Sequence, residues 1–209
     1  MRVRTVSRHI SDAAAGNIPP TPSGISDHAD LEALSSIICR VYPPVLLDTD
    51  GLREELCADE ILTASIKPGK ETSLSIPKEE QRAWNPKEPW LYPYSLEFDS
   101  DRVLGYFALR KCDVQMADDG YPRFFLNNQP YFQSGYWPDG LYTAPSDEAL
   151  IYDIRAMKDL GFNMLRKHGK VEADRWYFHC DRLGMLVWQD MPNGGSDYHH
   201  WFVTYLATL

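Results

Sequence analysis

The side chains best suited to chemistry follow two short apolar segments of the sequence. Arg166-Lys167-His168 follows the segment 162–165, and Trp188-Gln189-Asp190 follows the segment 185–187. An indole ring flanked by polar groups is typical of a pocket that binds a polar ligand. A second interpretation of Arg166 is a buried cation that packs against a carboxylate partner. Both interpretations require the two segments to lie side by side.

Two helix–glycine–strand units would position these residues. The sequence predicts a helix over 147–160, because apolar side chains recur there at spacings of three and four, at Leu150, Ile154, Met157 and Leu160. Ser146 can cap this helix and Gly161 can take the left-handed conformation that ends it. The same order repeats as a helix over 174–183, then Gly184, then a strand over 185–190. Helices that alternate with short strands predict a parallel sheet, and ligands bind at the carboxyl ends of its strands.

The preceding part of the chain carries strand signals without helices between them. They are EILTASIK, TSLSIP, LYPYSLEF and RVLGYFALRKCDV, and this succession predicts an antiparallel β-sandwich. The stretch 84–89 interrupts it, since two prolines so close together exclude a central strand. A hairpin over 123–133 is expected to turn at Asn127-Asn128, because both asparagines can hold a positive φ.

Residues 27–42 have two possible conformations. Apolar side chains at Leu31, Leu34, Ile38 and Val41 predict an amphipathic helix. A strand is the alternative, since β-branched residues such as Ile37 suit a strand as well. Residues 1–26 are rich in Pro, Ser, Gly and Ala, and we expect them to be disordered.

Composition excludes several classes of function. The net charge of −9 and the lack of a Lys/Arg cluster argue against binding to nucleic acid or to an anionic membrane. The sequence has no apolar run near the ~20 residues of a membrane span and no secretory signal, so we expect a soluble protein of unknown compartment. The four cysteines are widely spaced and predict free, mostly buried thiols. We expect no metal and no cofactor, since His199-His200 lacks a third ligand and no nucleotide-binding motif is present.

Several segments together resemble glycoside hydrolase family 2, the family of β-galactosidases, β-glucuronidases and β-mannosidases. The resemblance extends over about 62–195, in the segments WNPKEPWLYPYSLEF, DRVLGYFALRK, FFLNNQPYFQSGY, DIRAMKDLGFNMLRKH and WYFHCDRLGMLVWQDMP. Three positions depart from the family's pattern. Ala108 and Asn128 stand where glycine is usual, and His168 comes one residue early in the motif R-x-x-H.

This resemblance implies an α+β multidomain fold. We expect an immunoglobulin-like β-sandwich followed by an incomplete (β/α)8 TIM barrel that contains about its first three strands. The expected bounds are a poorly defined, partly disordered segment over 1–54, the sandwich over 55–118, and the first part of the barrel over 119–209.

The resemblance also implies the activity, hydrolysis of a β-glycosidic bond with retention of configuration by two glutamates. The family places these glutamates after barrel strands four and seven, so we expect this chain to hold no catalytic residue and to be inactive alone. Other carboxylates could take the role of the two catalytic glutamates only if a pair lay at the right separation by chance. The candidates are Asp190, Glu172 and Asp139. An alternative function is a carbohydrate-binding or interaction remnant without catalysis.

The expected partner is a β-glycoside, together with a remaining barrel fragment or an oligomer partner. The residues expected to bind the sugar lie at or near the ends of the barrel strands: Arg166, His168, Asp190, Trp188, Trp137 and Asp139.

Overall fold

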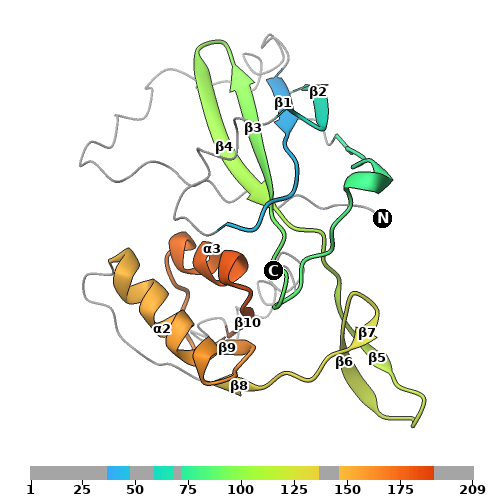
Figure 1. The fold of residues 1–209 in the computed structure, drawn as a ribbon, viewed down its shortest axis with the longest axis vertical. Coiled ribbons are helices and arrows are strands. Elements are labelled where there is room, and N and C mark those ends of the chain that lie inside the picture. Colours follow the sequence, from blue (N-terminus) through green and yellow to red (C-terminus); the bar gives the residue numbers. More distant parts are fainter. Residues whose placement is uncertain (1–36, 48–58, 68–71, 137–145, 191–209) are drawn as a thin grey trace, which may run out of the picture. The chain divides into compact units, whose positions relative to one another are not determined.

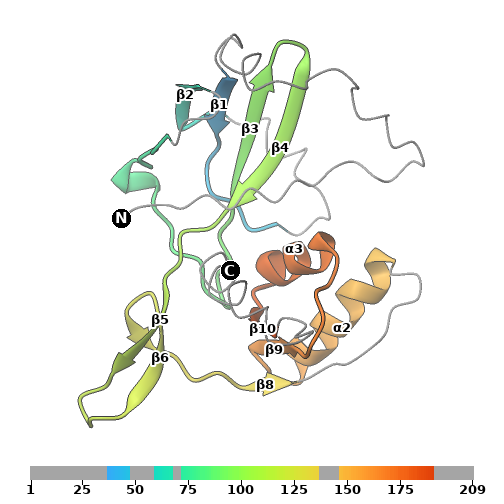
Figure 2. The same cartoon turned by 180° about the vertical axis from the view of Figure 1, so that it is seen from behind.

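The computed structural model describes residues 37–47, 59–67, 72–136 and 146–190, which are mostly β with few helices (Figure 1, and from behind in Figure 2). The chain divides into two compact units, each described by itself. Unit 1 includes the described residues of 37–45, 59–81 and 92–107, and unit 2 includes those of 46–47, 82–91 and 108–190.

Unit 1 contains one antiparallel sheet of four strands in the order β2-β1-β3-β4. Its elements are β1 (Ile37–Val41), β2 (Leu62–Ile66), the 3-10 helix η2 (Lys78–Glu80), β3 (Tyr92–Phe98) and β4 (Asp101–Phe107). A turn joins β3 to β4, and Asp99 holds a positive φ of 51° in it. Across this pair the rings of Tyr92 and Phe107 stack with centroids 5.0 Å apart. Such cross-strand pairs stabilise an antiparallel sheet.

Two local predictions in unit 1 are wrong. Of the segment 27–42, residues 27–36 lie outside the described residues, and at Ile37–Val41 the expected helix is wrong and the alternative of a strand is confirmed: β1 pairs there with β2 on one side and with β3 on the other. The β-branched residues there favour the strand, and pairing along both edges stabilises it. The segment 72–77 forms no strand and leads into η2. Pro77 ends that segment and cannot donate a ladder hydrogen bond.

Unit 2 begins its regular structure with an antiparallel sheet of order β5-β6-β7. The strands are β5 (Cys112–Met116), β6 (Pro122–Leu126) and β7 (Gln129–Pro130). The predicted turn between β6 and β7 is confirmed, since Asn127 and Asn128 have φ values of 52° and 63°. Asparagine tolerates this left-handed conformation better than most residues do.

The second part of unit 2 is the predicted parallel sheet with its helices. The sheet has the order β10-β9-β8, and both of its pairs are parallel. The elements are β8 (Gly135–Tyr136), α2 (Asp147–Asp159), β9 (Met164–Lys167), α3 (Asp174–Leu183) and β10 (Leu186–Gln189). The predicted helix ends are confirmed. The Ser146 side chain accepts a hydrogen bond from the Ala149 amide at 3.3 Å, and Gly161 and Gly184 have φ values of 89° and 71°.

Helices α2 and α3 lie side by side and share one hydrophobic core with the sheet (Figure 1). The buried members are Leu150, Ile154, Leu165, Trp176, Tyr177, Cys180 and Met185. Leu160 was predicted to join this face, and that prediction is wrong, because Leu160 follows the last helical residue and is 70% exposed. The immunoglobulin-like sandwich and the barrel remain predictions.

Cys39, Cys112 and Cys180 form no disulfide bond among the described residues, and the first and third of them are buried. Cys57 lies outside the described residues. Within the part of the chain that the structure describes, no helix is long and apolar enough to cross a membrane.

We predict that the shared core of α2, α3 and the sheet stabilises unit 2. Ile154→Ala should lower the free energy of unfolding by about 2–5 kcal/mol, because the Ile154 side chain is fully buried and its loss leaves a cavity. Urea unfolding followed by circular dichroism measures this. Leu160→Ala is the control and should change stability by less than about 0.5 kcal/mol. Equal losses from both variants would contradict this description of the core.

Candidate functional site

Arg166 and Asp190 form an ion pair at the carboxyl ends of β9 and β10. The guanidinium donates to Asp190 Oδ2 from Nη2 at 2.7 Å and from Nε at 3.0 Å. Both side chains are partly exposed, so the pair stabilises the fold by about 1 kcal/mol at most. Its main effect is to orient a donor and an acceptor beside one another.

Trp188 lies on the same face of the sheet as this pair. It is the register partner of Arg166 in the parallel ladder, and Asp190 follows it by two residues. Successive side chains of a strand point to opposite faces, so all three lie opposite the core residue Leu165. The indole is 44% exposed and packs edge-to-face against Phe124 of β6, with ring centroids 5.7 Å apart. An exposed ring thus lies next to the ion pair.

The opposite face of the same strands carries a buried cation. The Lys167 side chain is fully buried, with Nζ 2.9 Å from Glu172 Oε1 and 4.4 Å from the centroid of the Trp176 ring. Lys170 Nζ reaches the same carboxylate oxygen at 2.7 Å. An unpaired buried ammonium would be strongly destabilising, and the carboxylate and the ring's negative face offset that cost.

The environment of Glu172 decides its protonation. Burial raises the pKa of the carboxyl, but hydrogen bonding and Coulombic attraction from Lys170 and Lys167 outweigh it and lower the pKa below its ordinary value of 4.5. Glu172 is therefore ionised at neutral pH. A general acid of a glycosidase needs the opposite shift, so Glu172 is unsuited to that role.

The structure brings together three of the six predicted sugar-binding residues, Arg166, Trp188 and Asp190. His168 is exposed and lies one residue after β9. Trp137 and Asp139 lie outside the described residues. Among the described residues, no group of three or more His, Cys, Asp or Glu side chains could hold a metal ion.

Sequence reasoning missed the buried polar residues on the helix side of the sheet. Lys167 and Gln189 follow Leu165 and Val187 by two residues, so they fall on the face that packs against the helices. A polar residue at a core-facing position of a strand needs buried partners. The two-residue spacing from Leu165 to Lys167 and from Val187 to Gln189 was the sequence signal that could have predicted these buried polar residues.

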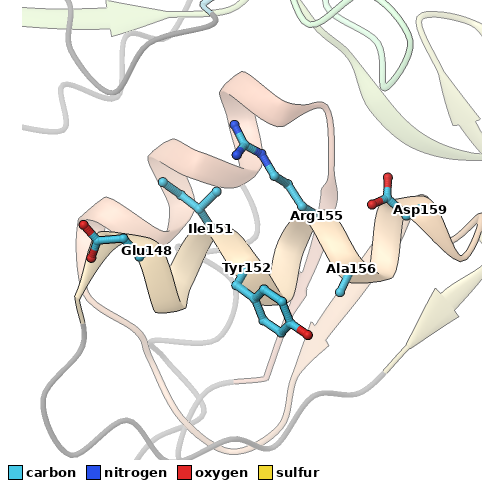
Figure 3. Close-up of a pocket in the computed structure, with 6 residues that line it drawn as sticks. All are labelled: Glu148, Ile151, Tyr152, Arg155, Ala156 and Asp159. Atoms are coloured by element: carbon cyan, nitrogen blue, oxygen red, sulfur yellow. The ribbon is translucent and has the colours of Figure 1, made fainter.

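A shallow depression on α2 holds none of the predicted residues. Figure 3 shows its lining, all from that one helix: Glu148, Ile151, Tyr152, Arg155, Ala156 and Asp159. Its lining residues belong to α2 and include none from the strand ends. The candidate site is therefore the surface around Arg166, Trp188 and Asp190.

Comparison with known proteins identifies glycosidases. No family model matches the chain. It is 25% identical over 128 residues to a β-galactosidase of Leuconostoc mesenteroides, and 35% identical over 98 residues to a mannosylglycoprotein endo-β-mannosidase of Lilium longiflorum. These matches cover 56% and 44% of the chain, and only 12% and 10% of the two relatives.

Solved structures show a similar fold. The fold is similar to the GH2 β-galacturonidase from Eisenbergiella tayi bound to galacturonate, with a TM-score of 0.57 and 18% identity. That similarity covers 76% of this chain and 26% of the other. The chain therefore spans a small part of the proteins that it resembles.

We predict that Glu172 makes stability depend on pH. The folded-state pKa of its carboxyl is lowered, so its contribution is fully present above the ordinary value of 4.5 and is lost as the pH falls through the folded-state pKa. Glu172→Gln should cost about 3 kcal/mol at pH 7, since it leaves Lys167 buried without its carboxylate. The difference from the parent protein should shrink at acidic pH.

Urea unfolding at several pH values between 3 and 7 measures this dependence. Glu88→Gln, at an exposed position of unit 2, is the control and should change little at any pH. A cost of Glu172→Gln that stayed constant across the range would refute the assignment.

Proposed function

We propose that this chain, which resembles glycoside hydrolase family 2 over part of its length, is part of an enzyme that hydrolyses β-glycosidic bonds with retention of configuration. The observation that carries the proposal is the ion pair of Arg166 and Asp190 beside Trp188, at the carboxyl ends of parallel strands. Ligands bind at that end of the strands in parallel α/β folds. The relatives are a β-galactosidase and an endo-β-mannosidase by name, which favours a β-glycoside as the substrate.

We assign the sugar-binding roles by the chemistry of each group. Arg166 donates hydrogen bonds to sugar hydroxyls, Asp190 accepts them, and the exposed Trp188 ring packs on an apolar face of the pyranose. His168 contributes from the loop after β9. Trp137 and Asp139 complete the proposed set.

The catalytic carboxylates are proposed to lie elsewhere in the enzyme. A retaining glycosidase needs two carboxyl groups about 5 Å apart, one of them able to give up a proton. Asp190 is held by Arg166, and Glu172 is ionised between two lysines. Both are suited to orienting neighbouring groups, and neither is suited to acid catalysis.

The proposed architecture is an immunoglobulin-like sandwich over 55–118 and the first part of a (β/α)8 barrel over 119–209. The antiparallel strands β2, β3 and β4, which lie within 55–118, and the order β8, α2, β9, α3, β10 in unit 2 support it. The three parallel strands of the described residues do not by themselves close a barrel. We therefore propose that further β/α units, in the same polypeptide or in a partner chain, complete the enzyme.

The direct test of this function uses the protein encoded by the complete transcript of the gene. We expect it to hydrolyse at least one nitrophenyl glycoside among the β-galactoside, β-mannoside, β-glucuronide and β-galacturonide. Proton NMR of the first-formed sugar should show the β anomer. Formation of the α anomer, or no hydrolysis of any of the four, would refute the proposal.

For the 209-residue chain alone we predict no turnover of these four substrates, because neither Asp190 nor Glu172 is suited to give up the proton that the reaction needs. Asp190→Asn should be equally inactive. Release of nitrophenol, followed by absorbance, measures this. Turnover by the chain that is lost in Asp190→Asn would make Asp190 a catalytic residue and overturn the assignment.

A further inference from the structure

A buried amide links the loop after β9 to the end of β10. Gln189 is 2% exposed, and its Nε2 donates to the backbone carbonyls of Lys170 and of Asp190, both at 2.6 Å. Its Oε1 accepts a hydrogen bond from the Tyr177 hydroxyl. The two carbonyls can only accept, so the NH2 group must face them, and this fixes the orientation of the amide. Both hydrogens and the oxygen of the amide are used.

The hydroxyl of Tyr177 extends the connection to the other end of the loop. While it donates to Gln189, it accepts a hydrogen bond from the backbone amide of Glu172 at 3.3 Å. The tyrosine ring belongs to the core of α2, α3 and the sheet, so the hydroxyl has a fixed position. The loop is therefore held at the Lys170 carbonyl and at the Glu172 amide by side chains of β10 and α3.

The side chain of Glu172 adds a third attachment. Its carboxylate lies between Lys167 of β9 and Lys170 of the loop, and the Lys167 ammonium lies over the ring of Trp176 in α3. These contacts are all on the helix side of the sheet, opposite Arg166 and Asp190. They include no group that could reach a sugar on the other face, so their effect on a ligand must pass through the backbone.

We infer that Gln189 is a positioning residue of the strand-end site: its amide fixes the loop 168–173 relative to Asp190. The loop begins at His168, two residues after Arg166, so holding it fixes the backbone that carries both side chains, and this backbone need not rearrange on binding. A site held in its bound geometry loses less conformational entropy when the ligand arrives. The inference rests on the proposed sugar-binding role of this surface.

The first test measures the loop without any ligand. Gln189→Glu keeps the shape but places an oxygen against two carbonyl oxygens, and Tyr177→Phe removes only the hydroxyl. Both should speed hydrogen exchange of the amides in 168–173 by about tenfold, as expected for loss of one buried hydrogen bond. Gln129→Glu, on the exposed strand β7, should leave the exchange unchanged.

The pH dependence of Gln189→Glu distinguishes positioning from general damage. A protonated carboxyl can donate to one of the two carbonyls, and burial favours that neutral form. Protection of the loop should therefore recover partly as the pH falls. Unchanged protection in folded Gln189→Glu at neutral pH would overturn the inference, and should that variant fail to fold, unchanged protection in Tyr177→Phe would overturn it.

The second test adds a ligand. Calorimetry with methyl β-galactoside, methyl β-mannoside and methyl β-glucuronide should show that both variants bind about tenfold more weakly than the parent chain. Equal affinity of parent and variants would overturn the positioning role. Should the parent chain bind none of the three sugars, the proposed sugar-binding role fails, and the exchange experiment still decides whether Gln189 orders the loop.

Discussion

The parallel register between β9 and β10 is the constraint on which the site depends. It sets Arg166 beside Trp188, and the two-residue period of a strand then places Asp190 on that face and Lys167 and Gln189 on the other. A slip of β9 by one residue would exchange the two faces of that strand. It would turn Arg166 toward the helices, away from Asp190, and would expose Lys167. The core shared by α2, α3 and the sheet opposes such a slip, because it buries Leu165 on one side only.

The two faces of β9 and β10 differ in proposed function: one can bind a ligand and the other supports the strands. The Arg166–Asp190 pair is partly exposed and weak, so it can exchange partners with a sugar at low cost. The Lys167–Glu172 pair is buried, and removing one partner is expensive. Binding groups thus lie on the open face and rigid supporting groups on the closed face. Functional sites generally need such a fixed supporting layer beneath the residues that touch the ligand.

Local sequence chemistry predicted much of unit 2. Ser146, Gly161 and Gly184 mark helix ends through hydrogen bonding and backbone freedom that act within a few residues. The first interpretation of Ile37–Val41 was a helix, although these residues form a strand. Local sequence could not decide between the two, because the strand's pairing partners lie far along the chain. The strand-end rule predicted that Arg166, Trp188 and Asp190 lie together, and their role in binding stays a prediction. It could not predict the network of Gln189, because that network depends on how Tyr177 of α3 meets β10 in three dimensions.

Sugar binding at the ends of β9 and β10 is measured most directly by titrating the isotopically labelled chain with methyl β-glycosides. The titration is followed by two-dimensional ¹H–¹⁵N NMR. The indole signal of Trp188, assigned with Trp188→Phe, and the Nε–H signal of Arg166, assigned with Arg166→Lys, should move together along one saturating curve. Signals of residues in unit 1 should stay in place. Saturating shifts confined to unit 1, or no shift at Trp188 and Arg166 with any of the sugars, would contradict a sugar-binding surface at the ends of β9 and β10.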